Sequence, residues 1–356
     1  MVLKVKQSIF KIESYVPGKS TPNAIKLSSN ENALGASGKA IQAFKDCSEY
    51  LFKYPDGSAK QLRTAIASKI GLGLQDVNVV IGAGSDEIFS MLSTTLLQEG
   101  DNIVQSEYGF LMYAIYAYSH GAEVVRVKDT DFTANLNAML SAVNNKTKIV
   151  YLANPNNPTG TMVDFKQIKD FFNKLPPSVV LVLDLAYKEY APSEGLSELY
   201  KLCIERDNLV ITQTFSKAYG LAALRVGYCI CSKWLADVIN RVRGPFNTAA
   251  PSQAACVAAL ADDDFIAKSL ANNDTQKLYL YSQLDSLGFA YLKTEANFIM
   301  FDAKDKAAQL DEFLTQNGIV IRRLEAYNLN SYLRVSIGTP EQNAKFVEAL
   351  QLFAKL

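Results

Sequence analysis

The stretch Lys148-Ile-Val-Tyr-Leu-Ala-Asn-Pro-Asn-Asn-Pro-Thr-Gly160 combines a short apolar run with a turn that holds two prolines and a glycine. The next apolar run, Val179-Val-Leu-Val-Leu-Asp184, follows after a longer segment with helix-like spacing. Short, nearly continuous apolar strands joined by helices are typical of a parallel sheet that is covered on both faces. The two runs therefore predict strands of such a sheet.

The same alternation extends outward in both directions, from about residue 60 to residue 245. Runs rich in β-branched residues recur, with longer helix-like segments between most of them. These runs cover residues 77–81, 102–105, 123–127, 148–152, 179–184, 209–213 and 226–231. We therefore predict an α/β fold with a mostly parallel central sheet and helices on both faces. Ligands of such sheets bind outside the carboxyl ends of the strands.

Beyond about residue 250 the regular alternation of strands and helices ends, which predicts a smaller α+β domain at the C-terminal end. A long helical region over 252–287 comes first. We expect strands at 289–292, 297–301, 318–324 and 332–337, a helix at about 305–316 and a last helix from Pro340. The predicted organisation is an N-terminal arm (1–30) that packs with the small domain, a large domain (31–248) and the small domain (249–356).

Composition narrows the function classes. The chain has 356 residues, and its 36 Lys+Arg balance 36 Asp+Glu, which argues against a nucleic-acid partner. No apolar run approaches the length of a membrane helix, and the start of the sequence lacks an apolar signal segment. Five scattered cysteines are typical of a reducing compartment, so we expect a cytoplasmic protein.

The sequence contains a single histidine, His120, which precedes a glycine at a predicted helix end. One histidine cannot build a His-rich zinc site, and we expect no metal. An enzyme of this composition would move protons with a lysine, a tyrosine or a carboxylate.

A phosphate-binding turn is one interpretation of Ile81-Gly-Ala-Gly-Ser-Asp-Glu87, which follows a strand and opens a helix. A small residue such as Gly84 lets the backbone approach a ligand, and the free N–H groups at Ser85 and Asp86 suit an anion. A dinucleotide site would need a third glycine where Glu87 stands. A plain strand-to-helix turn is the alternative.

Three further motifs follow strands of the predicted sheet. Residues 154–160 form either a ligand-facing turn or a connecting loop. Asp184, with Tyr187 three residues later, ends an apolar strand, where its carboxylate would either need a cation or cap a helix. The segment Thr214-Phe-Ser-Lys-Ala-Tyr-Gly220 carries Lys217, which is either a Schiff-base nucleophile or a solvated surface charge.

Ser216 and Arg225 could bind an anion beside Lys217. All four motifs fall at the carboxyl ends of predicted strands. Together they suit one ligand with a phosphate, a basic ring nitrogen and an aldehyde, and pyridoxal 5'-phosphate (PLP) has these groups.

On these motifs the chain resembles the fold-type-I PLP-dependent aminotransferases, and within them the histidinol-phosphate aminotransferase subfamily. The resemblance runs essentially from end to end. Its motifs are Ser29-Asn-Glu-Asn32, Leu34-Gly35, Tyr54-Pro-Asp-Gly57, Gly82-Ala-Gly-Ser-Asp-Glu87, Tyr108-Gly-Phe110, residues 154–160, Asp184 with Ala186-Tyr187, Ser216-Lys217, Leu224-Arg-Val-Gly227, Ala296-Asn-Phe298, Gly318-Ile-Val-Ile-Arg-Arg323 and Leu333-Arg-Val-Ser-Ile-Gly338.

The resemblance implies that Lys217 holds PLP as a Schiff base and that Asp184 pairs with the ring nitrogen. It also implies that Tyr54 reaches the phosphate from the partner subunit, so that the protein is a homodimer with shared active sites. The other implied cofactor contacts are Tyr187 and Asn157 at the ring O3', Tyr108 stacked on the ring, and Gly84, Ser85, Asp86, Thr214, Ser216 and Arg225 near the phosphate.

For the substrate, the resemblance implies that Arg334 binds a carboxylate, that Arg322 and Tyr15 bind a distal group, and that Asn157 is also in contact. The implied reaction is transfer of the amino group of L-histidinol phosphate to 2-oxoglutarate in histidine biosynthesis. An aminotransferase for phenylalanine or tyrosine is the main alternative, and a threonine-phosphate decarboxylase is another.

Three positions depart from the pattern of many relatives. Leu185 replaces an acidic residue, Ala33 follows Asn32 where proline is usual, and Arg323 stands where some relatives have aspartate. The last two lie near the substrate in the resembling family, and they leave the choice of amino donor open.

Overall fold

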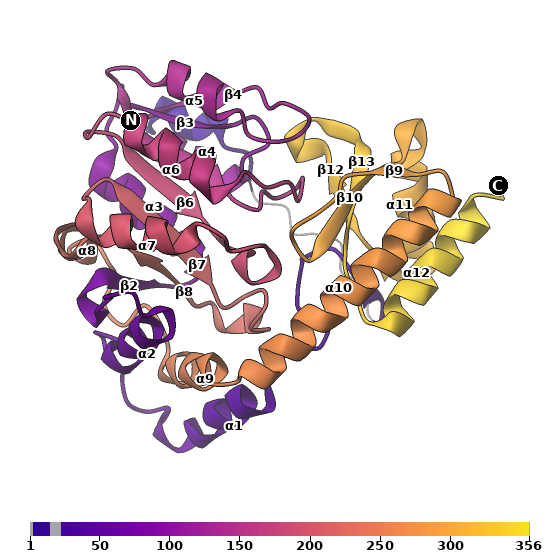
Figure 1. The fold of residues 1–356 in the computed structure, drawn as a ribbon, viewed down its shortest axis with the longest axis horizontal. Coiled ribbons are helices and arrows are strands. Elements are labelled where there is room, and N and C mark those ends of the chain that lie inside the picture. Colours follow the sequence, from indigo (N-terminus) through magenta and orange to yellow (C-terminus); the bar gives the residue numbers. More distant parts are fainter. Residues whose placement is uncertain (1–2, 15–22, 356) are drawn as a thin grey trace.

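The computed structural model describes residues 3–14 and 23–355, and its central element is a seven-stranded sheet (Figure 1). The strand order is β2-β8-β7-β6-β5-β3-β4. All neighbouring strands pair in parallel except β8, which runs antiparallel to both β2 and β7. The strands are β2 (Val79–Gly82), β3 (Asn102–Ser106), β4 (Glu123–Val127), β5 (Thr147–Ala153), β6 (Val180–Asp184), β7 (Leu209–Thr214) and β8 (Gly227–Ile230). The predicted mostly parallel α/β fold is confirmed.

The two faces of this sheet bury separate cores, because successive strand residues point to opposite sides. In β6, Leu181 and Leu183 pack on one face and Val182 packs on the other. The first face is covered by α2 (Lys60–Ile70), α5 (Leu136–Ala142), α6 (Phe165–Lys174), α7 (Leu196–Glu205) and α9 (Ala250–Leu260). The second face is covered by α3 (Ser85–Leu96), α4 (Leu111–Ser119) and α8 (Lys233–Asn240).

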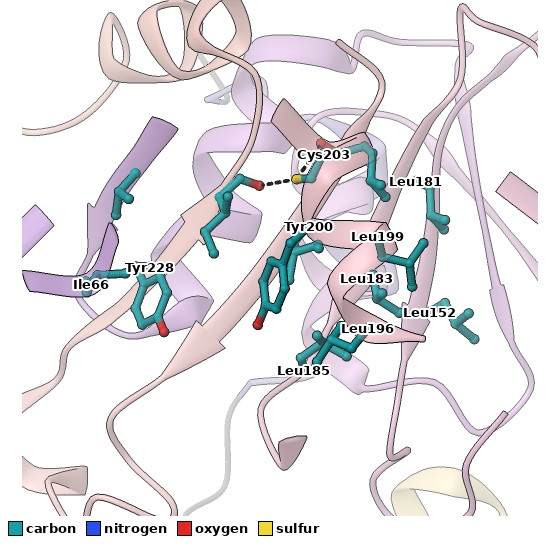
Figure 2. Close-up of a cluster of buried hydrophobic side chains, with 14 of the residues drawn as sticks. Ile66, Leu152, Leu181, Leu183, Leu185, Leu196, Leu199, Tyr200, Cys203 and Tyr228 are labelled. Carbon is teal, nitrogen blue, oxygen red and sulfur yellow. Dashed lines mark hydrogen bonds between the residues drawn. The ribbon is translucent and has the colours of Figure 1, made fainter. Parts of the chain in front are cut away.

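Figure 2 shows part of the first core. Leu181 and Leu183 lie near Leu199 and Cys203 of α7. The Cys203 thiol donates a hydrogen bond to the carbonyl of Ile230 at 2.9 Å, and burial raises the pKa of this thiol. A thiol that is buried and bonded in this way acts as a small apolar residue rather than as a nucleophile.

The smaller C-terminal α+β domain is also present as predicted. Its antiparallel sheet has the order β12-β13-β10-β9. The strands are β9 (Ala290–Tyr291), β10 (Phe298–Asp302), β12 (Arg322–Leu324) and β13 (Leu329–Ser336), and the helices are α10 (Asp263–Ser286), α11 (Ala307–Gln316) and α12 (Pro340–Phe353). Helix α10 runs from the large domain into the small one (Figure 1). Within the described residues, no helix is both long and apolar enough to cross a membrane.

Two predicted elements are divided in the structure. The helical region 252–287 forms α9 and α10, because the backbone leaves the helical conformation at Asp262, whose carboxylate pairs with Lys39. The predicted strand 318–324 forms β11 (Ile319–Val320) and β12, which pair with different strands.

The N-terminal arm touches both domains. Strand β1 (Ile25–Lys26) pairs with β11 of the small domain, whereas the short helix η1 (Gln7–Lys11) lies beside α4 of the large domain. Helix α9, which the predicted division gives to the small domain, packs with α1 (Gly38–Asp46) and α2 against the large-domain core. The packing of α9 therefore places the boundary between the large and small domains within α10. The division of the chain into these domains stays a prediction.

Candidate active site

A cavity of about 320 Å³ opens where β5, β6 and β7 end. This is the edge at which parallel sheets bind ligands. Its walls combine the turns after these strands, the start of α3 and part of the N-terminal segment. The lining residues are Ser29, Glu31, Ser85, Asp86, Phe110, Ala153, Pro155, Asn157, Asp184, Ala186, Tyr187, Thr214, Ser216, Lys217, Ala222 and Arg225. Most of the predicted site residues therefore share one cavity.

Lys217 lies just after β7, and its Nζ donates a hydrogen bond to the carbonyl of Ser29 at 3.2 Å. The same nitrogen lies 5.7 Å from the ring centre of Tyr187. Burial, assisted by the positive charge of Arg334, lowers the pKa of Lys217 to about 8. The amine therefore loses its proton more readily than a solvated lysine does, and the neutral amine is the nucleophile. This environment favours the nucleophile over the surface-charge interpretation.

Asp184 ends β6 and is only 6% exposed. Its Oδ2 accepts a hydrogen bond from the Tyr113 hydroxyl at 2.6 Å, and its Oδ1 accepts one from the Thr212 hydroxyl at 3.0 Å. Burial raises the pKa of Asp184, and these hydrogen bonds oppose that rise. Because both hydroxyl donors are neutral, a cationic group of a ligand would satisfy this carboxylate better.

Helix α4 contributes two phenols that the sequence motifs do not single out. Tyr113 donates to Asp184, and Tyr116 donates to Asp86 Oδ2 at 2.7 Å. Tyrosines three residues apart lie on one helix face, so a single helix can serve both carboxylates. Their spacing on a helix after β3 was the sequence signal that could have identified these two tyrosines as site residues. Aromatic residues at helical spacing more commonly belong to a core, however, so the signal is weak.

The turn between β2 and α3 is enclosed by Arg225 and by β8. A Cβ atom at Gly84 would lie 2.5 Å from Arg225 Nη2, and one at Gly227 would lie 2.1 Å from the Ser85 nitrogen. Arg225 Nη1 also donates to Ser216 Oγ at 3.4 Å. A guanidinium, a hydroxyl and the N–H groups at the start of a helix therefore converge here, and together they suit a phosphate.

Three more predicted residues, Asn157, Tyr187 and Thr214, lie in the cavity wall. The Tyr187 hydroxyl accepts a hydrogen bond from Asn30 Nδ2 at 2.9 Å, and the Thr214 hydroxyl accepts one from the Ser216 backbone N–H at 3.1 Å. These bonds orient both side chains before any ligand arrives.

Arg334 connects the small domain to the cavity. It lies on β13 and donates to Asn157 Oδ1 and to the Ser28 carbonyl, while its Nε is buried with no hydrogen-bond partner in the described part of the chain. Its register partner on β12 is Arg322, so both side chains leave the same face of the sheet. Like charges placed opposite each other repel, and an anion bound by both would relieve that repulsion.

Tyr108 does not line the cavity as its predicted stacking role requires. Its ring instead packs on Phe132, with ring centres 5.6 Å apart, and its carbonyl accepts a hydrogen bond from Asn156 Nδ2. Phe110, two residues later, lies in the cavity wall. The sequence motif therefore finds the right segment, and the structure favours a different aromatic ring in it.

Tyr54, a further predicted contact, is not in this cavity wall. Tyr54 is 81% exposed and stacks on Phe246, with ring centres 4.5 Å apart. Tyr15 lies outside the described residues. Because Tyr54 is exposed, its side chain is accessible to a second subunit. The contact with that subunit remains a prediction.

Comparison with known proteins agrees with this site. The family model for aminotransferase class I and II matches residues 22–350. The curated histidinol-phosphate aminotransferase of Maricaulis maris is 40% identical, and the match covers 100% of both chains. The curated histidinol-phosphate aminotransferase of Moorella thermoacetica is 41% identical, over 98% of this chain and 93% of the relative.

Solved structures give the same picture. A histidinol-phosphate aminotransferase from Sinorhizobium meliloti, in complex with pyridoxal-5'-phosphate, superposes with a TM-score of 0.88 at 28% identity, covering 93% of this chain and 91% of that one. A double mutant of the aspartate aminotransferase from Thermus thermophilus superposes with a TM-score of 0.83 at 19% identity, covering 94% of this chain and 91% of that one. The second similarity shows the shared fold alone.

Proposed function

The chain belongs to the aminotransferase class I and II family, and from this premise we propose that it is a PLP-dependent enzyme that transfers the amino group of L-histidinol phosphate to 2-oxoglutarate. The observation that carries the proposal is the convergence of Lys217, Asp184 and Arg225 on one cavity. Relatives that match over the full length and are named histidinol-phosphate aminotransferase support this amino donor, and with it a role in histidine biosynthesis.

The residues of the cavity fit PLP. Arg225, Ser216 and the start of α3 offer an anion site for the phosphate. The buried carboxylate of Asp184, which receives hydrogen bonds from two neutral hydroxyls, suits a protonated ring nitrogen. Lys217 presents an amine of lowered pKa for the aldehyde. Phosphate, ring nitrogen and aldehyde thus each find a matching group.

When bound, PLP supplies an aldehyde that reacts with amines and a ring that withdraws electrons from the substrate's Cα–H bond. Lys217 would hold the cofactor through Nζ and, as a free amine, would take the proton from the substrate's Cα. Asp184 would keep the ring nitrogen protonated, because ion pairing is stronger in a buried site than in water. Tyr113 and Thr212 hold that carboxylate in position.

The two arginines of the small domain would bind the anionic groups of the substrates. Arg322 binds the phosphate of histidinol phosphate, together with Tyr15, and Arg334 binds the carboxylate of 2-oxoglutarate. Phe110 and Tyr187 line the wall and would pack on or bond to the cofactor ring. Arg334 already has its Nε buried and unpaired within the described residues, so a carboxylate would supply the missing acceptor.

A homodimer with shared active sites is part of the proposal. Tyr50, Leu51, Phe52, Tyr54 and Phe246 are exposed apolar residues, and we call them the aromatic patch. Exposed apolar surface of this kind is typical of an interaction site. In the dimer, Tyr54 would reach the phosphate held by the partner subunit.

We also propose a cytoplasmic location, because the five cysteines are free and four of them are buried.

A half-reaction tests the proposed function. The PLP-loaded protein is mixed with L-histidinol phosphate or with L-phenylalanine, without a keto acid, and the visible absorbance of the cofactor is followed. We expect histidinol phosphate to bleach the absorbance at a much lower concentration than phenylalanine does. Addition of 2-oxoglutarate should restore the absorbance.

The outcomes separate the candidate activities. Equal or better bleaching by phenylalanine would indicate an aromatic aminotransferase. Release of carbon dioxide from threonine phosphate, without bleaching by either amine, would indicate the decarboxylase. Failure of the protein to retain PLP would contradict the proposal as a whole.

A further inference from the structure

Glu87 stands where a dinucleotide-binding turn would carry its third glycine, and the proposed chemistry does not use it. Its Oε2 accepts hydrogen bonds from the Ala83 backbone N–H and from Asn247 Nδ2, each at 2.6 Å. Ala83 lies in the turn between β2 and α3, and Glu87 is the third residue of α3. A carboxylate at this helix position that reaches back to the preceding backbone fixes the start of the helix. Glu87 therefore holds the phosphate turn from within its own helix.

Asn247 and Arg243 extend this contact away from the cavity. Asn247 Nδ2 also donates to the Ile81 carbonyl at 3.1 Å, and its Oδ1 accepts from Arg243 Nη1 at 2.9 Å. Arg243 Nη2 in turn donates to the Gly57 carbonyl at 2.8 Å. An unbroken series of hydrogen bonds thus joins three segments that are far apart in the sequence.

The far end of this series lies beside the aromatic patch. Gly57 is three residues after Tyr54. The Tyr54 ring stacks on Phe246, and a Cβ atom added at Gly57 would lie 3.3 Å from the same ring. Phe246 is itself adjacent to Asn247 in the chain. A second subunit that orders the aromatic patch would therefore also act on the backbone at Gly57 and Ile81, which Arg243 and Asn247 hold.

We propose that Glu87, Asn247 and Arg243 form a relay that couples PLP binding at the phosphate turn to subunit association at the aromatic patch, with Glu87 as a positioning residue. The inference rests on the proposed function. The relay places the Ala83 amide, and through it the N–H groups of the next residues, which must point at the phosphate. Coupling between two binding events is reciprocal, so each PLP molecule strengthens the dimer by the factor by which dimerisation strengthens the binding of that PLP.

The relay predicts a definite set of variants. Glu87→Met removes the acceptor of both bonds, and Arg243→Met cuts the connection to Gly57. Glu87→Gln is the conservative variant, because its amide oxygen can accept from the same two donors. Arg241→Met is the matched control, since Arg241 lies two residues before Arg243, is exposed, and pairs with Asp237 of the preceding helix α8.

The experiment measures the dissociation constant of PLP from the cofactor-free protein and the dimer dissociation constant with and without PLP, the latter by analytical ultracentrifugation. In the wild-type protein and in Arg241→Met, we expect PLP to tighten the dimer about tenfold, a usual size for coupling between sites. In Glu87→Met and Arg243→Met, PLP affinity should fall about tenfold, and PLP should tighten the dimer clearly less than in the wild type, since only the direct contact of Tyr54 with the phosphate across the interface would then couple the two events. Glu87→Gln should retain most of the coupling.

Each contrary result has a clear meaning. Wild-type PLP affinity in a folded Glu87→Met protein would overturn the positioning role. Weaker PLP binding in Arg243→Met, with unchanged tightening of the dimer by PLP, would overturn the coupling. If Glu87→Met does not fold, the comparison of Glu87→Gln with Arg243→Met decides the same point. Absence of PLP binding by the wild-type protein would overturn the proposed function, and the coupling with it.

Discussion

The two ends of the candidate active site are built in different ways. At the phosphate end, backbone atoms of the β2–α3 turn lie within contact of Arg225 and β8, and Gly84 and Gly227 leave no room for a side chain. At the substrate end, Arg322 and Arg334 project from two strands of the small domain, and their positions depend on the register of those strands. The phosphate end thus combines main-chain atoms with Arg225 and Ser216, whereas the substrate end depends on two arginine side chains.

This difference suggests how the protein divides its tasks. A site that relies largely on backbone amides changes little when surface side chains change, and it tolerates no added atom at its glycines. A site made of two arginines can be altered one side chain at a time. We therefore expect cofactor binding and substrate choice to respond to separate substitutions.

Lys217 should give the largest effect, because both ends need it. Lys217→Ala removes the attachment of PLP and the group that moves the Cα proton. We expect turnover to fall by more than about 10³-fold, since general acid–base catalysis alone contributes about 10²–10⁴-fold. Steady-state assays with histidinol phosphate measure it, and the exposed Lys233→Ala is the control. Near wild-type turnover in Lys217→Ala would remove Lys217 from the mechanism.

Gly227→Ala should damage the phosphate end selectively. The new Cβ atom would lie 2.1 Å from the Ser85 nitrogen, and it must push the turn aside. We expect PLP to bind about tenfold or more weakly, because overpacking of this kind costs about 1–3 kcal/mol. Equilibrium dialysis measures the affinity. Gly244→Ala is the matched control, because a Cβ atom there meets no atom within 4 Å. Equal affinities for both variants would show that the turn is not tightly enclosed.

Arg322→Met should affect the substrate end alone. A charged hydrogen bond contributes about 1.5–3 kcal/mol. We therefore expect kcat/KM for histidinol phosphate to fall about 10- to 100-fold, while PLP affinity and activity on phenylalanine change little. Arg323→Met, the next residue of β12, whose side chain pairs with Glu325, is the control. An equal loss for both amino donors would mean that Arg322 does not select the phosphate.

A smaller effect is expected in the pH dependence of folding, where neither end takes part. In the folded cofactor-free protein the pKa of Lys217 is about 8, below its ordinary value of 10.5. Between these values the unfolded chain binds more protons, so the free energy of unfolding rises with pH. The contribution is at most about 1.4 kcal/mol for each pKa unit.

Urea unfolding of the cofactor-free wild type and of Lys217→Met, at about pH 7 and about pH 10, measures this difference. The wild type should gain stability relative to the variant as the pH rises. Tyrosines, cysteines and the other lysines titrate in both proteins, so the difference between the wild type and the variant cancels their contribution. A difference that stays constant with pH would mean that Lys217 is not desolvated in the folded state.

The sequence predicts the phosphate end better than the substrate end, and the reason is physical. The chemical groups at the phosphate end follow strands of one parallel sheet, so local pattern and strand direction bring Asp184, Lys217 and Ser85 to one edge. The substrate end depends on the pairing of β12 with β13, which sets Arg322 opposite Arg334. Register of this kind follows from tertiary packing and not from a local motif.

The aromatic residues show the same limit at a finer scale. The motif at residues 108–110 locates a segment of the wall, but the ring that faces the cavity is decided by the packing of Tyr108 on Phe132. Tyr113 carries no motif, because its role depends on the distance from α4 to the end of β6. The predicted contact of Tyr54 depends on a partner subunit, and Tyr15 lies outside the described residues, so neither follows from the fold of the single chain.

Helix α10 connects the large domain to the small domain. Its 24 residues begin beside the large-domain core and end among the buried side chains of the small domain. A helix of this length is about 36 Å long, so a tilt of about 5° at its first turn moves its last turn by about 3 Å. A tilt of α10 would therefore move the small domain, and with it Arg322 and Arg334, relative to the phosphate turn.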